Sequence, residues 1–421
     1  MSKKYFYLEI GKHPKESDFV ALFKIEPSDG KTIEEAANSV AAESSIGTWT
    51  DVSTMSEEFR EKFKAKVTRI DENFVEIAYP SILFERGNMP QIYSSIAGNI
   101  FGMKEIKNIR LESLKFPEEF VQSFDGPKYG IDGIRKKLKI FDRPIVGTIV
   151  KPKIGLDPES QSEVLYEAMV GGVDVVKDDE NLTSQDFCLF EERLKKCLEK
   201  TKKAEDETGE GKGYIPNITA PLDIMLKRAE MVEKLGGIFA MVDIVTAGWS
   251  SLQTLRKNSF NLILHGHRAM HAAFTRNKLH GISMEVISRS SRLIGIDQLH
   301  IGTAVGKMEG KRSEVERCAN SLRMQEEGEG TLKQKWFSVK SSMPIASGGL
   351  HPGHIPALYE IFGKDCIFQF GGGIHGHPEG TKSGAKAVRD SLKASLNKIS
   401  LTEAAKNNKE LMMALEKWGI S

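Results

Sequence analysis

The chain has few cysteines, and their spacing excludes two common kinds of site. Its 421 residues include four cysteines, which are widely scattered and form no Cys-X-X-Cys pair. Structural zinc sites and disulfide frameworks need closely and regularly spaced cysteines. We therefore expect reduced thiols, as in a cytosolic protein.

Long apolar runs and an excess of charge of one sign are also missing. No run of about 18 apolar residues occurs, so no membrane span is expected, and residues 1–18 have no apolar segment of signal-peptide length. The 59 basic and 58 acidic side chains nearly cancel. This balance argues against nucleic acid or an anionic membrane as a partner. We expect a cytoplasmic protein that binds anions only through local clusters.

The first part of the chain has the pattern of a small α+β domain, which we place at residues 1–125. Segments 19–27 and 73–80 are rich in β-branched and aromatic residues, as strands are. Between them, residues 32–45 have the apolar spacing of a helix. A further strand is predicted at 106–117.

A different rhythm begins near residue 140, where short apolar strands alternate with amphipathic helices. Eight such units over roughly 280 residues predict a (β/α)₈ barrel, which we place at residues 126–421 with a C-terminal helical extension. A doubly wound sheet is the alternative fold. The predicted strands with their polar ends cover residues 144–152, 173–180, 214–220, 239–248, 261–269, 298–306, 343–349 and 367–373.

The end of the second predicted barrel strand carries the tetrad Lys177-Asp178-Asp179-Glu180. Alternation along a strand puts Lys177 and Asp179 on one side. Two carboxylates suit a hard cation such as Mg²⁺, and a lysine beside them is sensible if CO₂ converts its amine to an anionic carbamate. A solvated, ion-paired strand end is the alternative interpretation.

Basic side chains gather at the other strand ends, where a barrel places its active site. Arg268 offers a fork that matches phosphate, and a lysine can act as a point charge, an acid or a base. Lys307 stands in a glycine-flanked loop, as expected of a mobile lid. Together they indicate a pocket for a doubly anionic substrate. The cluster comprises Lys151, Lys153, His267, Arg268, His300 and Lys307.

Two glycine runs, Ser347-Gly348-Gly349 and Gly371-Gly372-Gly373, end strands 7 and 8. Barrels commonly bind phosphate there through bare backbone N–H groups. Tight turns are the alternative explanation for either run alone.

The histidines of HGHRAMH allow a competing interpretation. His265 and His267 form a His-X-His pair that could bind zinc, although no third well-spaced ligand accompanies it. His271 opens the next predicted helix and is expected to be structural. From the residues alone, the chain is a barrel enzyme that uses Mg²⁺ on a phosphorylated small molecule, and the reaction stays open.

Six barrel motifs and two N-terminal ones occur in an order that resembles one family. The motifs are AAESSIGTW (41–49), AGNIFGM (97–103), GTIVKPKIGL (147–156), GGVDVVKDDENLTSQ (171–185), LHGHRAMHA (264–272), HIGTAVGKMEG (300–310), IASGGLHPGHIPAL (345–358) and IFQFGGGIHGHP (367–378). The resemblance, which covers nearly the whole chain, is to the large subunit of ribulose-1,5-bisphosphate carboxylase/oxygenase (RuBisCO), of the archaeal form III type.

The resemblance implies a ferredoxin-like N-terminal domain before the TIM barrel. It also implies a lyase that carboxylates ribulose 1,5-bisphosphate with CO₂ to two 3-phosphoglycerates, with O₂ as the substrate of a side reaction. The implied cofactors are Mg²⁺ and an activator CO₂ held as the Lys177 carbamate, through which an enediolate forms. The implied pathway is archaeal metabolism of AMP and nucleoside-derived ribose phosphates.

The resemblance also assigns residues to roles. Carbamylated Lys177, Asp179 and Glu180 would hold Mg²⁺, and the catalytic residues would be Lys151, Lys177, His267 and Lys307. The substrate-binding residues would be Glu43, Thr48, Trp49, Asn99, Lys153, Arg268, His300, Ser347, Gly348, Gly349, Gln369, Phe370, Gly371 and Gly372.

In the family, the N-terminal residues Glu43, Thr48, Trp49 and Asn99 reach the barrel of a partner subunit. The resemblance therefore implies a homodimer at least, with a decamer of dimers as a larger form, and without a small subunit. Two rival functions are kept: a RuBisCO-like enolase or isomerase of methylthio-sugar phosphates, and a non-catalytic metabolite-binding barrel.

Overall fold

The computed structural model describes residues 5–48, 52–306, 311–326 and 332–420, which form two compact units. The first unit comprises residues 1–126, 270–294 and 324–339, and the second comprises the remainder. Each unit is described by itself. The predicted division of the chain at residue 125 stays a prediction.

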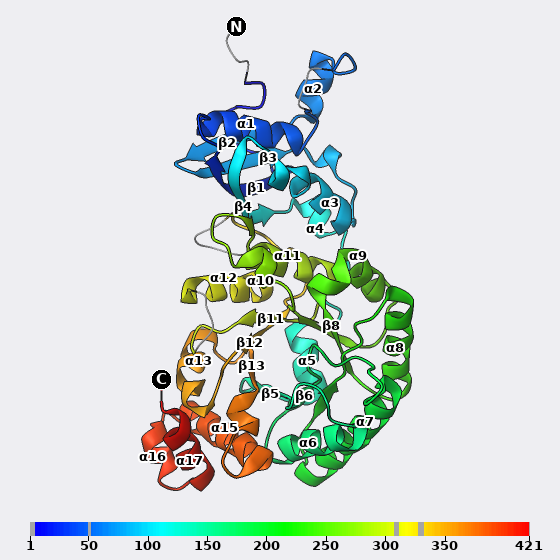
Figure 1. Cartoon of the computed structure of the whole chain (residues 1–421), viewed down its shortest axis with the longest axis vertical. Coiled ribbons are helices and arrows are strands. Elements are labelled where there is room, and N and C mark those ends of the chain that lie inside the picture. Colours follow the sequence, from blue (N-terminus) through cyan, green and yellow to red (C-terminus); the bar gives the residue numbers. More distant parts are fainter. Residues whose placement is uncertain (1–4, 49–51, 307–310, 327–331, 421) are drawn as a thin grey trace. The chain divides into compact units, whose positions relative to one another are not determined.

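The first unit contains a five-stranded sheet in the order β10-β4-β1-β3-β2, of which β1 to β4 are labelled in Figure 1. Central β1 pairs antiparallel with both β3 and β4, and β10 joins β4 in parallel. The strands predicted at 19–27 and 73–80 are confirmed. The strands are β1 (Phe19–Pro27), β2 (Lys66–Asp71), β3 (Phe74–Tyr79), β4 (Ile106–Lys115) and β10 (Gly281–Ile282).

Helix α1 (Ile33–Glu43) shows why the local sequence folds as it does. Thr32 and Glu35 form a reciprocal capping box at its start, and the buried side chains Ala36 and Val40 stand one turn apart on a single face. Its last residue, Glu43, is one of the predicted site residues. The other helices are α2 (Glu57–Phe63), α3 (Met89–Ile96), α4 (Glu118–Val121), α10 (Ala272–Thr275), α11 (Met284–Ile294) and the 3₁₀ turns η1 (Ser81–Leu83) and η2 (Asn99–Gly102).

The second unit is built on eight parallel strands in the order β7-β6-β5-β13-β12-β11-β9-β8. Backbone hydrogen bonds from Met241 N to Pro216 O (2.8 Å) and from Ile218 N to Met241 O (3.0 Å) bring the two ends of this order together. A nearly closed barrel results, which confirms the prediction over the doubly wound alternative. The strands are β5 (Ile145–Ile149), β6 (Val175–Lys177), β7 (Gly213–Ile215), β8 (Phe239–Asp243), β9 (Ile263–His267), β11 (Gln298–Gly302), β12 (Met343–Ser347) and β13 (Ile367–Phe370).

Helices follow the barrel strands along the chain and surround them in Figure 1. Asp157 caps α6 by accepting a hydrogen bond from Ser160 N (2.7 Å), with Pro158 at the first helical position. The helices are α5 (Gly130–Leu138), α6 (Pro158–Val170), α7 (Phe190–Thr208), α8 (Leu222–Lys234), α9 (Ile244–Lys257), α12 (Arg312–Arg323), α13 (Ile355–Phe362), α14 (Gly372–His375), α15 (Gly380–Leu396), α16 (Leu401–Ala405), α17 (Lys409–Trp418) and the turn η3 (Pro352–His354).

The barrel interior is apolar at one level and polar at the next. Its fully buried apolar layer includes Val175, Ile263, Ile345 and Ile367. Side chains alternate along a strand. Residues two or four positions after these apolar residues therefore also point into the barrel. Those residues, at the carboxyl ends of the strands, are Lys177, His265, His267, Ser347 and Gln369.

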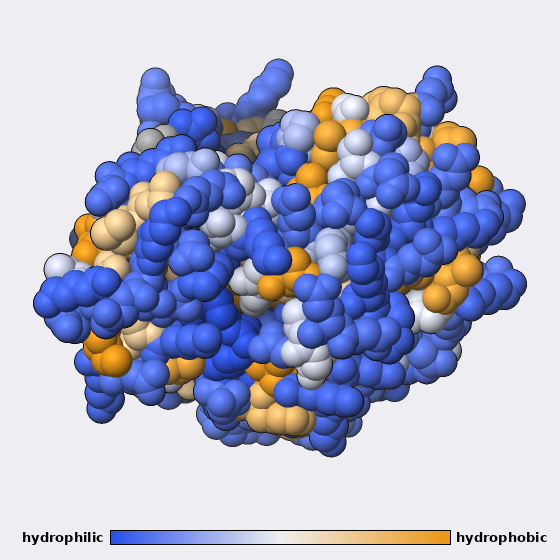
Figure 2. Space-filling view, turned by 90° about the horizontal axis from the view of Figure 1, so that it is seen from below, coloured by the Kyte–Doolittle hydropathy of each residue, from blue (hydrophilic) through white to orange (hydrophobic). Residues whose placement is uncertain are grey.

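The structure describes no helix that is both long and apolar enough to span a membrane. On the face drawn in Figure 2 the surface is mostly hydrophilic, and apolar side chains occur in small separate groups.

A buried ion pair at the opposite ends of the strands gives a stability prediction. Asp174 is fully buried and bonds Arg143 through both oxygens (2.6 and 2.8 Å), while its carboxylate also accepts Val146 N (2.8 Å). Burial alone would raise the pKa of Asp174, but the guanidinium of Arg143 brings it below its ordinary value. Its stabilising effect is therefore present above the pKa of an unfolded aspartate and is lost as pH falls through the lower folded value.

Asp174→Asn is expected to lower the free energy of unfolding by about 3–5 kcal/mol at pH 7, because it leaves the Arg143 charge uncompensated. The variant should also lose less stability than the wild type on acidification below about pH 4. Denaturant titration at several pH values measures both effects. The matched control is Asp365→Asn, since Asp365 pairs with Arg135 (2.7 Å) but is 40% exposed. Equal effects of the two substitutions would contradict the argument.

Candidate active site

Directly after β6, the side chains of the adjacent Asp178 and Asp179 point in different directions. Lys151 Nζ donates to Asp179 Oδ2 at 2.6 Å, and Lys177 Nζ lies 3.7 Å from Glu180 Oε2. Asp178 points away from this group and is fully buried. The alternation predicted from the sequence therefore holds, with Lys177 and Asp179 on the same side.

The Asp178 carboxylate is used entirely by the protein. Its four hydrogen bonds saturate both oxygens, so Asp178 cannot serve as a metal ligand without losing structural partners. The donors are Arg193 Nε (3.1 Å), Tyr214 OH (2.8 Å), Gln161 Nε2 (3.2 Å) and Asn217 N (2.9 Å).

Burial sets the protonation behaviour of the lysine. The Lys177 side chain is 1% exposed, and burial, more than any charge nearby, lowers the pKa of its ammonium, although Glu180 and Asp179 act in the opposite direction. Its Nζ donates to the carbonyl oxygen of Asp178 (2.8 Å). A lysine of this kind is more readily neutral, and only a neutral amine reacts with CO₂.

The two carboxylates stay ionised in this environment. Burial would raise the pKa of Asp179, but the Lys151 ammonium and the Asn181 amide lower it below its ordinary value. For Glu180, burial is again outweighed, here by Lys177 and His267, and the pKa is lowered. Two anionic oxygen donors beside an amine fit a hard divalent cation.

Within the described part of the chain, no three His, Cys, Asp or Glu side chains are grouped so that they could hold a metal ion. Asp179 and Glu180 give this site two anionic oxygen donors. The His265–His267 zinc alternative gains no support, because His265 bonds His300 and His267 bonds Asp243 instead of converging.

His267 is oriented by an acid that the sequence analysis did not single out. Its Nδ1 lies 3.1 Å from Asp243 Oδ1 and its Nε2 lies 3.6 Å from Glu180 Oε2. Burial and the nearby Lys177 charge lower the pKa of His267. Glu180 is also 3.8 Å from the exposed Nζ of Lys153. An imidazole beside the carboxylate pair can accept and return a proton.

Asp243 and Asn217 could have been found from the sequence. Each lies within a segment predicted as a barrel strand with its polar end, Asn217 in 214–220 and Asp243 in 239–248, and the strand-end rule applies to them as it does to the basic residues. Asn217 donates to the backbone oxygen of Glu180 (3.1 Å). Asp243 therefore orients His267, and Asn217 fixes the backbone at Glu180.

A second group of basic side chains lies along β9 and β11. His300 bonds His265 through Nε2 (2.8 Å) and Ser347 Oγ through Nδ1 (2.7 Å). Arg268 donates from Nη1 to Ile301 O (3.0 Å), and burial lowers the pKa of its guanidinium to about 10. A partly buried cation with donors to spare suits an anionic group such as phosphate.

The glycine runs lie beside these charges. Gly348 and Gly349 have φ of +122° and +67°, which side-chain-bearing residues rarely adopt. A Cβ on Gly371 would lie 3.5 Å from Lys151 Cε, so the glycine run after β13 adjoins Lys151, which follows β5. Gly372 opens the short helix α14.

The two other predicted site residues on β13, Gln369 and Phe370, contact the neighbouring barrel strand. Gln369 is buried, and its Nε2 lies 3.5 Å from Thr148 O, while Phe370 is fully buried and its carbonyl accepts Thr148 Oγ1 (2.7 Å). Their contacts are with the adjacent strand β5. A direct contact of either residue with substrate stays a prediction.

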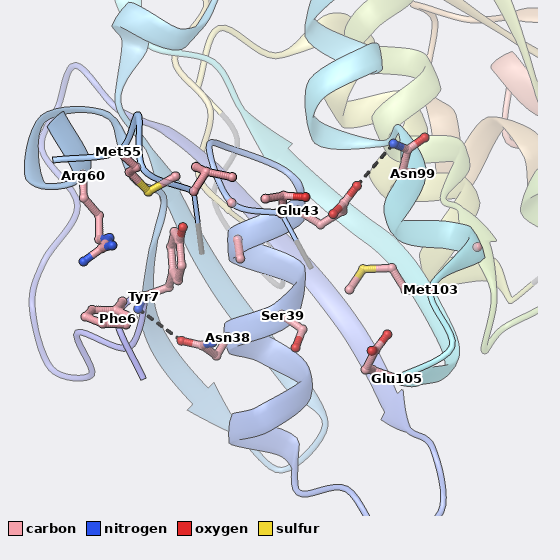
Figure 3. A pocket seen from close by; sticks show the side chains of 15 residues that line it. Phe6, Tyr7, Asn38, Ser39, Glu43, Met55, Arg60, Asn99, Met103 and Glu105 are labelled. Carbon is pink, nitrogen blue, oxygen red and sulfur yellow. Dashed lines mark hydrogen bonds between the residues drawn. The ribbon is translucent and has the colours of Figure 1, made fainter. Parts of the chain in front are cut away.

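The N-terminal site residues meet in a pocket of the first unit (Figure 3). Asn99 Nδ2 donates to Glu43 Oε1 (3.2 Å), and both residues line a cavity of about 860 Å³ together with Thr48. Two other predicted site residues, Trp49 and Lys307, lie outside the described residues. The resemblance names Glu43, Thr48 and Asn99 as substrate-binding residues. In the structure all three line the same cavity of the first unit.

Comparison with known proteins identifies the family. The description "Ribulose bisphosphate carboxylase large chain" applies to both matching family models, the N-terminal domain over residues 6–120 and the catalytic domain over residues 130–418. The ribulose bisphosphate carboxylase of Methanosarcina mazei is 51% identical over 421 residues, which cover 98% of each chain.

Two solved structures are similar over nearly the full length. The dimeric archaeal Rubisco from Hyperthermus butylicus is 45% identical with a TM-score of 0.93, and the match covers 99% of this chain and 100% of that one. Octameric Rubisco from Pyrococcus horikoshii, solved with sulfate, is 44% identical with a TM-score of 0.92, over 99% and 97% of the two chains. On its sequence, its barrel and these relatives, the chain belongs to the ribulose bisphosphate carboxylase large-chain family and is an enzyme of that family.

Proposed function

We propose that the enzyme carboxylates ribulose 1,5-bisphosphate to two 3-phosphoglycerates at a site centred on carbamylated Lys177. The observation that carries this proposal is the buried lysine, whose pKa is lowered, next to two ionised carboxylates at the mouth of the barrel. Lys177 as carbamate, Asp179 and Glu180 would hold Mg²⁺. The metal would supply Lewis acidity to the oxygens of the substrate.

The protein side chains divide the proton transfers. Lys177, once converted to its carbamate, would supply the base for the proton on C3 of the sugar, and CO₂ would add at C2. Water would then add at C3 before the C2–C3 bond breaks, and His267, oriented by Asp243, would accept a proton from that water. Lys151, next to Asp179, returns a proton to C2 after the C–C bond breaks. Lys307 of the lid would stabilise the new carboxylate.

The two phosphates would be bound at separate parts of the mouth. Arg268 would hold one, with His300 fixed beside it by its bonds to His265 and Ser347, and the backbone N–H groups of Gly349, Gly371 and Gly372 would hold the other. Lys153 adds positive charge near Glu180, and Ser347 contacts the sugar. O₂ would compete with CO₂ in the side reaction.

Arg268→Lys is expected to raise the KM for ribulose 1,5-bisphosphate at least about tenfold, because an ammonium cannot offer the planar fork that matches a phosphate. The kcat should fall less than the KM rises if the phosphate contact is equally strong in the ground and transition states. Steady-state kinetics with saturating CO₂ measures both. Arg323→Lys, on α12 with its guanidinium bonded to Phe362 O, is the control, and an unchanged KM in Arg268→Lys would remove Arg268 from the phosphate site.

We also propose a homodimer at least, in which Glu43, Thr48, Trp49 and Asn99 of one copy complete the barrel site of another. The dimeric and octameric relatives support a homo-oligomer. Multi-angle light scattering distinguishes dimer, octamer and decamer. In a mixed oligomer of Glu43→Gln and Lys177→Ala chains, recovery of activity above that of either variant alone would demonstrate the shared site.

For the pathway, we propose the use of nucleoside-derived ribose phosphates, as expected of the archaeal type. A cell extract given ribose-labelled AMP should form labelled 3-phosphoglycerate, and depletion of this enzyme should stop that labelling.

Fixation of ¹⁴C-bicarbonate tests the activity itself. Purified oligomer is preincubated without oxygen with CO₂ and Mg²⁺ and then given ribulose 1,5-bisphosphate. Acid-stable label in 3-phosphoglycerate is the expected result. An assembled protein that incorporates no label would refute the proposal and would direct the next assay to methylthio-sugar phosphates.

A further inference from the structure

Three polar side chains from three strands form a continuous chain of hydrogen bonds inside the barrel. His265 of β9 bonds His300 of β11 through the two Nε2 atoms (2.8 Å), and His300 Nδ1 bonds Ser347 Oγ of β12 (2.7 Å). The His265 and His300 rings are 0% and 2% exposed. The proposed function gives roles to His300 and Ser347 but none to His265.

The geometry of this chain links the protonation of its members. A hydrogen bond between two Nε2 atoms needs one proton between them, so one ring donates and the other accepts. If His300 donates at Nε2, its Nδ1 is a bare acceptor and must receive the hydroxyl proton of Ser347. If His265 donates, His300 carries its proton on Nδ1 and donates to Ser347, whose own proton is then free.

The surroundings of His265 favour the second arrangement. Its Nδ1 is buried and has no hydrogen-bond partner among the described residues. In the first arrangement this Nδ1 would carry a buried proton without an acceptor. Buried donors without an acceptor are rarer in proteins than acceptors without a donor.

Neither His265 nor His300 is expected to take up a second proton. Burial, the largest effect, lowers the pKa of both His265 and His300 well below the ordinary value. Both rings are therefore neutral at the pH at which the enzyme would work, and each carries a single proton.

We propose that His265 is a positioning residue that fixes the tautomer of His300 and thereby makes the Ser347 hydroxyl a hydrogen-bond donor toward the sugar bisphosphate. This inference rests on the proposed function, since it needs a substrate oxygen next to Ser347. His265 does not touch the substrate and acts only through His300.

The tautomers can be measured without substrate. In oligomer labelled with ¹⁵N-histidine, NMR is expected to show the proton of His265 on Nε2 and that of His300 on Nδ1, with signals assigned by their loss in His265→Gln and His300→Gln. A proton on Nε2 of His300 would overturn the inference. This result does not depend on whether the protein fixes CO₂, so the proposed function can fail separately.

The kinetic consequence is tested with a double-mutant cycle. His265→Phe is expected to raise the KM for ribulose 1,5-bisphosphate about tenfold, roughly the worth of one hydrogen bond to the substrate, with kcat changed less than about twofold. In a Ser347→Ala background the same substitution should change the KM less than about twofold, because the donor is already gone. An equal rise in both backgrounds would assign His265 a purely structural role.

Two further variants separate positioning from packing. His265→Gln can still donate a proton near the same place and should restore the KM to within about threefold of the wild type. His271→Gln, in the same sequence motif but bonded to Thr275, should leave the KM unchanged. If His265→Phe does not assemble, two other measurements test the role of His265. These are the tautomers of the wild type and the KM of His265→Gln.

Discussion

Replacing Lys177 by alanine is expected to abolish CO₂ fixation, with turnover reduced at least about 10³-fold. The substitution removes the only amine that is both buried at the barrel mouth and close to Glu180, with a lowered pKa, among the described site residues. It also removes the third anionic donor that a carbamate would give to the cation. A loss of several kcal/mol of transition-state stabilisation corresponds to this factor.

The measurement is the incorporation of ¹⁴C into 3-phosphoglycerate, combined with ¹³C NMR of protein equilibrated with ¹³CO₂. The wild type should show one carbamate signal per chain that Lys177→Ala lacks. Lys212→Gln is the matched control, because Lys212 is also buried but bonds Val173 O (3.0 Å) and Glu210 (2.9 Å) instead of lining the mouth. Residual fixation above about one percent in Lys177→Ala would show that the carbamate is not required.

The sequence predicts the barrel because each of its signals is local. Short apolar runs, the Asp157 cap and the polar residues after each strand are read from neighbouring positions. Parallel strands in a closed ring must bring their carboxyl ends to one face, so the convergence of Lys151, Lys177 and His300 follows from the fold itself.

The partners within the site could not be predicted in the same way. The four donors to Asp178 come from positions 15 to 39 residues away along the chain, and the link from His265 through His300 to Ser347 joins three strands. Such contacts depend on register and rotamers, which no local pattern specifies. The association of Glu43 with Asn99 was expected from the family resemblance alone.

Two adjacent aspartates at the end of β6 should respond to mutation in opposite ways. Asp179→Asn is expected to reduce turnover about 10³-fold or more and to weaken Mg²⁺ binding in the presence of CO₂ at least about 100-fold, because it removes an anionic ligand. The free energy of unfolding should fall by less than in Asp178→Asn: Asp179 is itself buried, but Lys151, the partner left behind, is 27% exposed and can be solvated.

Asp178→Asn is expected to lower the free energy of unfolding by about 3–5 kcal/mol, because Arg193 is 0% exposed and would keep its charge without a counterion. Calorimetric titration of Mg²⁺ and denaturant unfolding, applied to both variants, separate the two roles. Whatever fraction of Asp178→Asn remains folded should still bind Mg²⁺, because the Asp178 carboxylate faces α7 and Tyr214 and not the cation site. Loss of Mg²⁺ affinity in folded Asp178→Asn, or a large loss of stability in Asp179→Asn, would contradict the division of the two carboxylates between structure and chemistry.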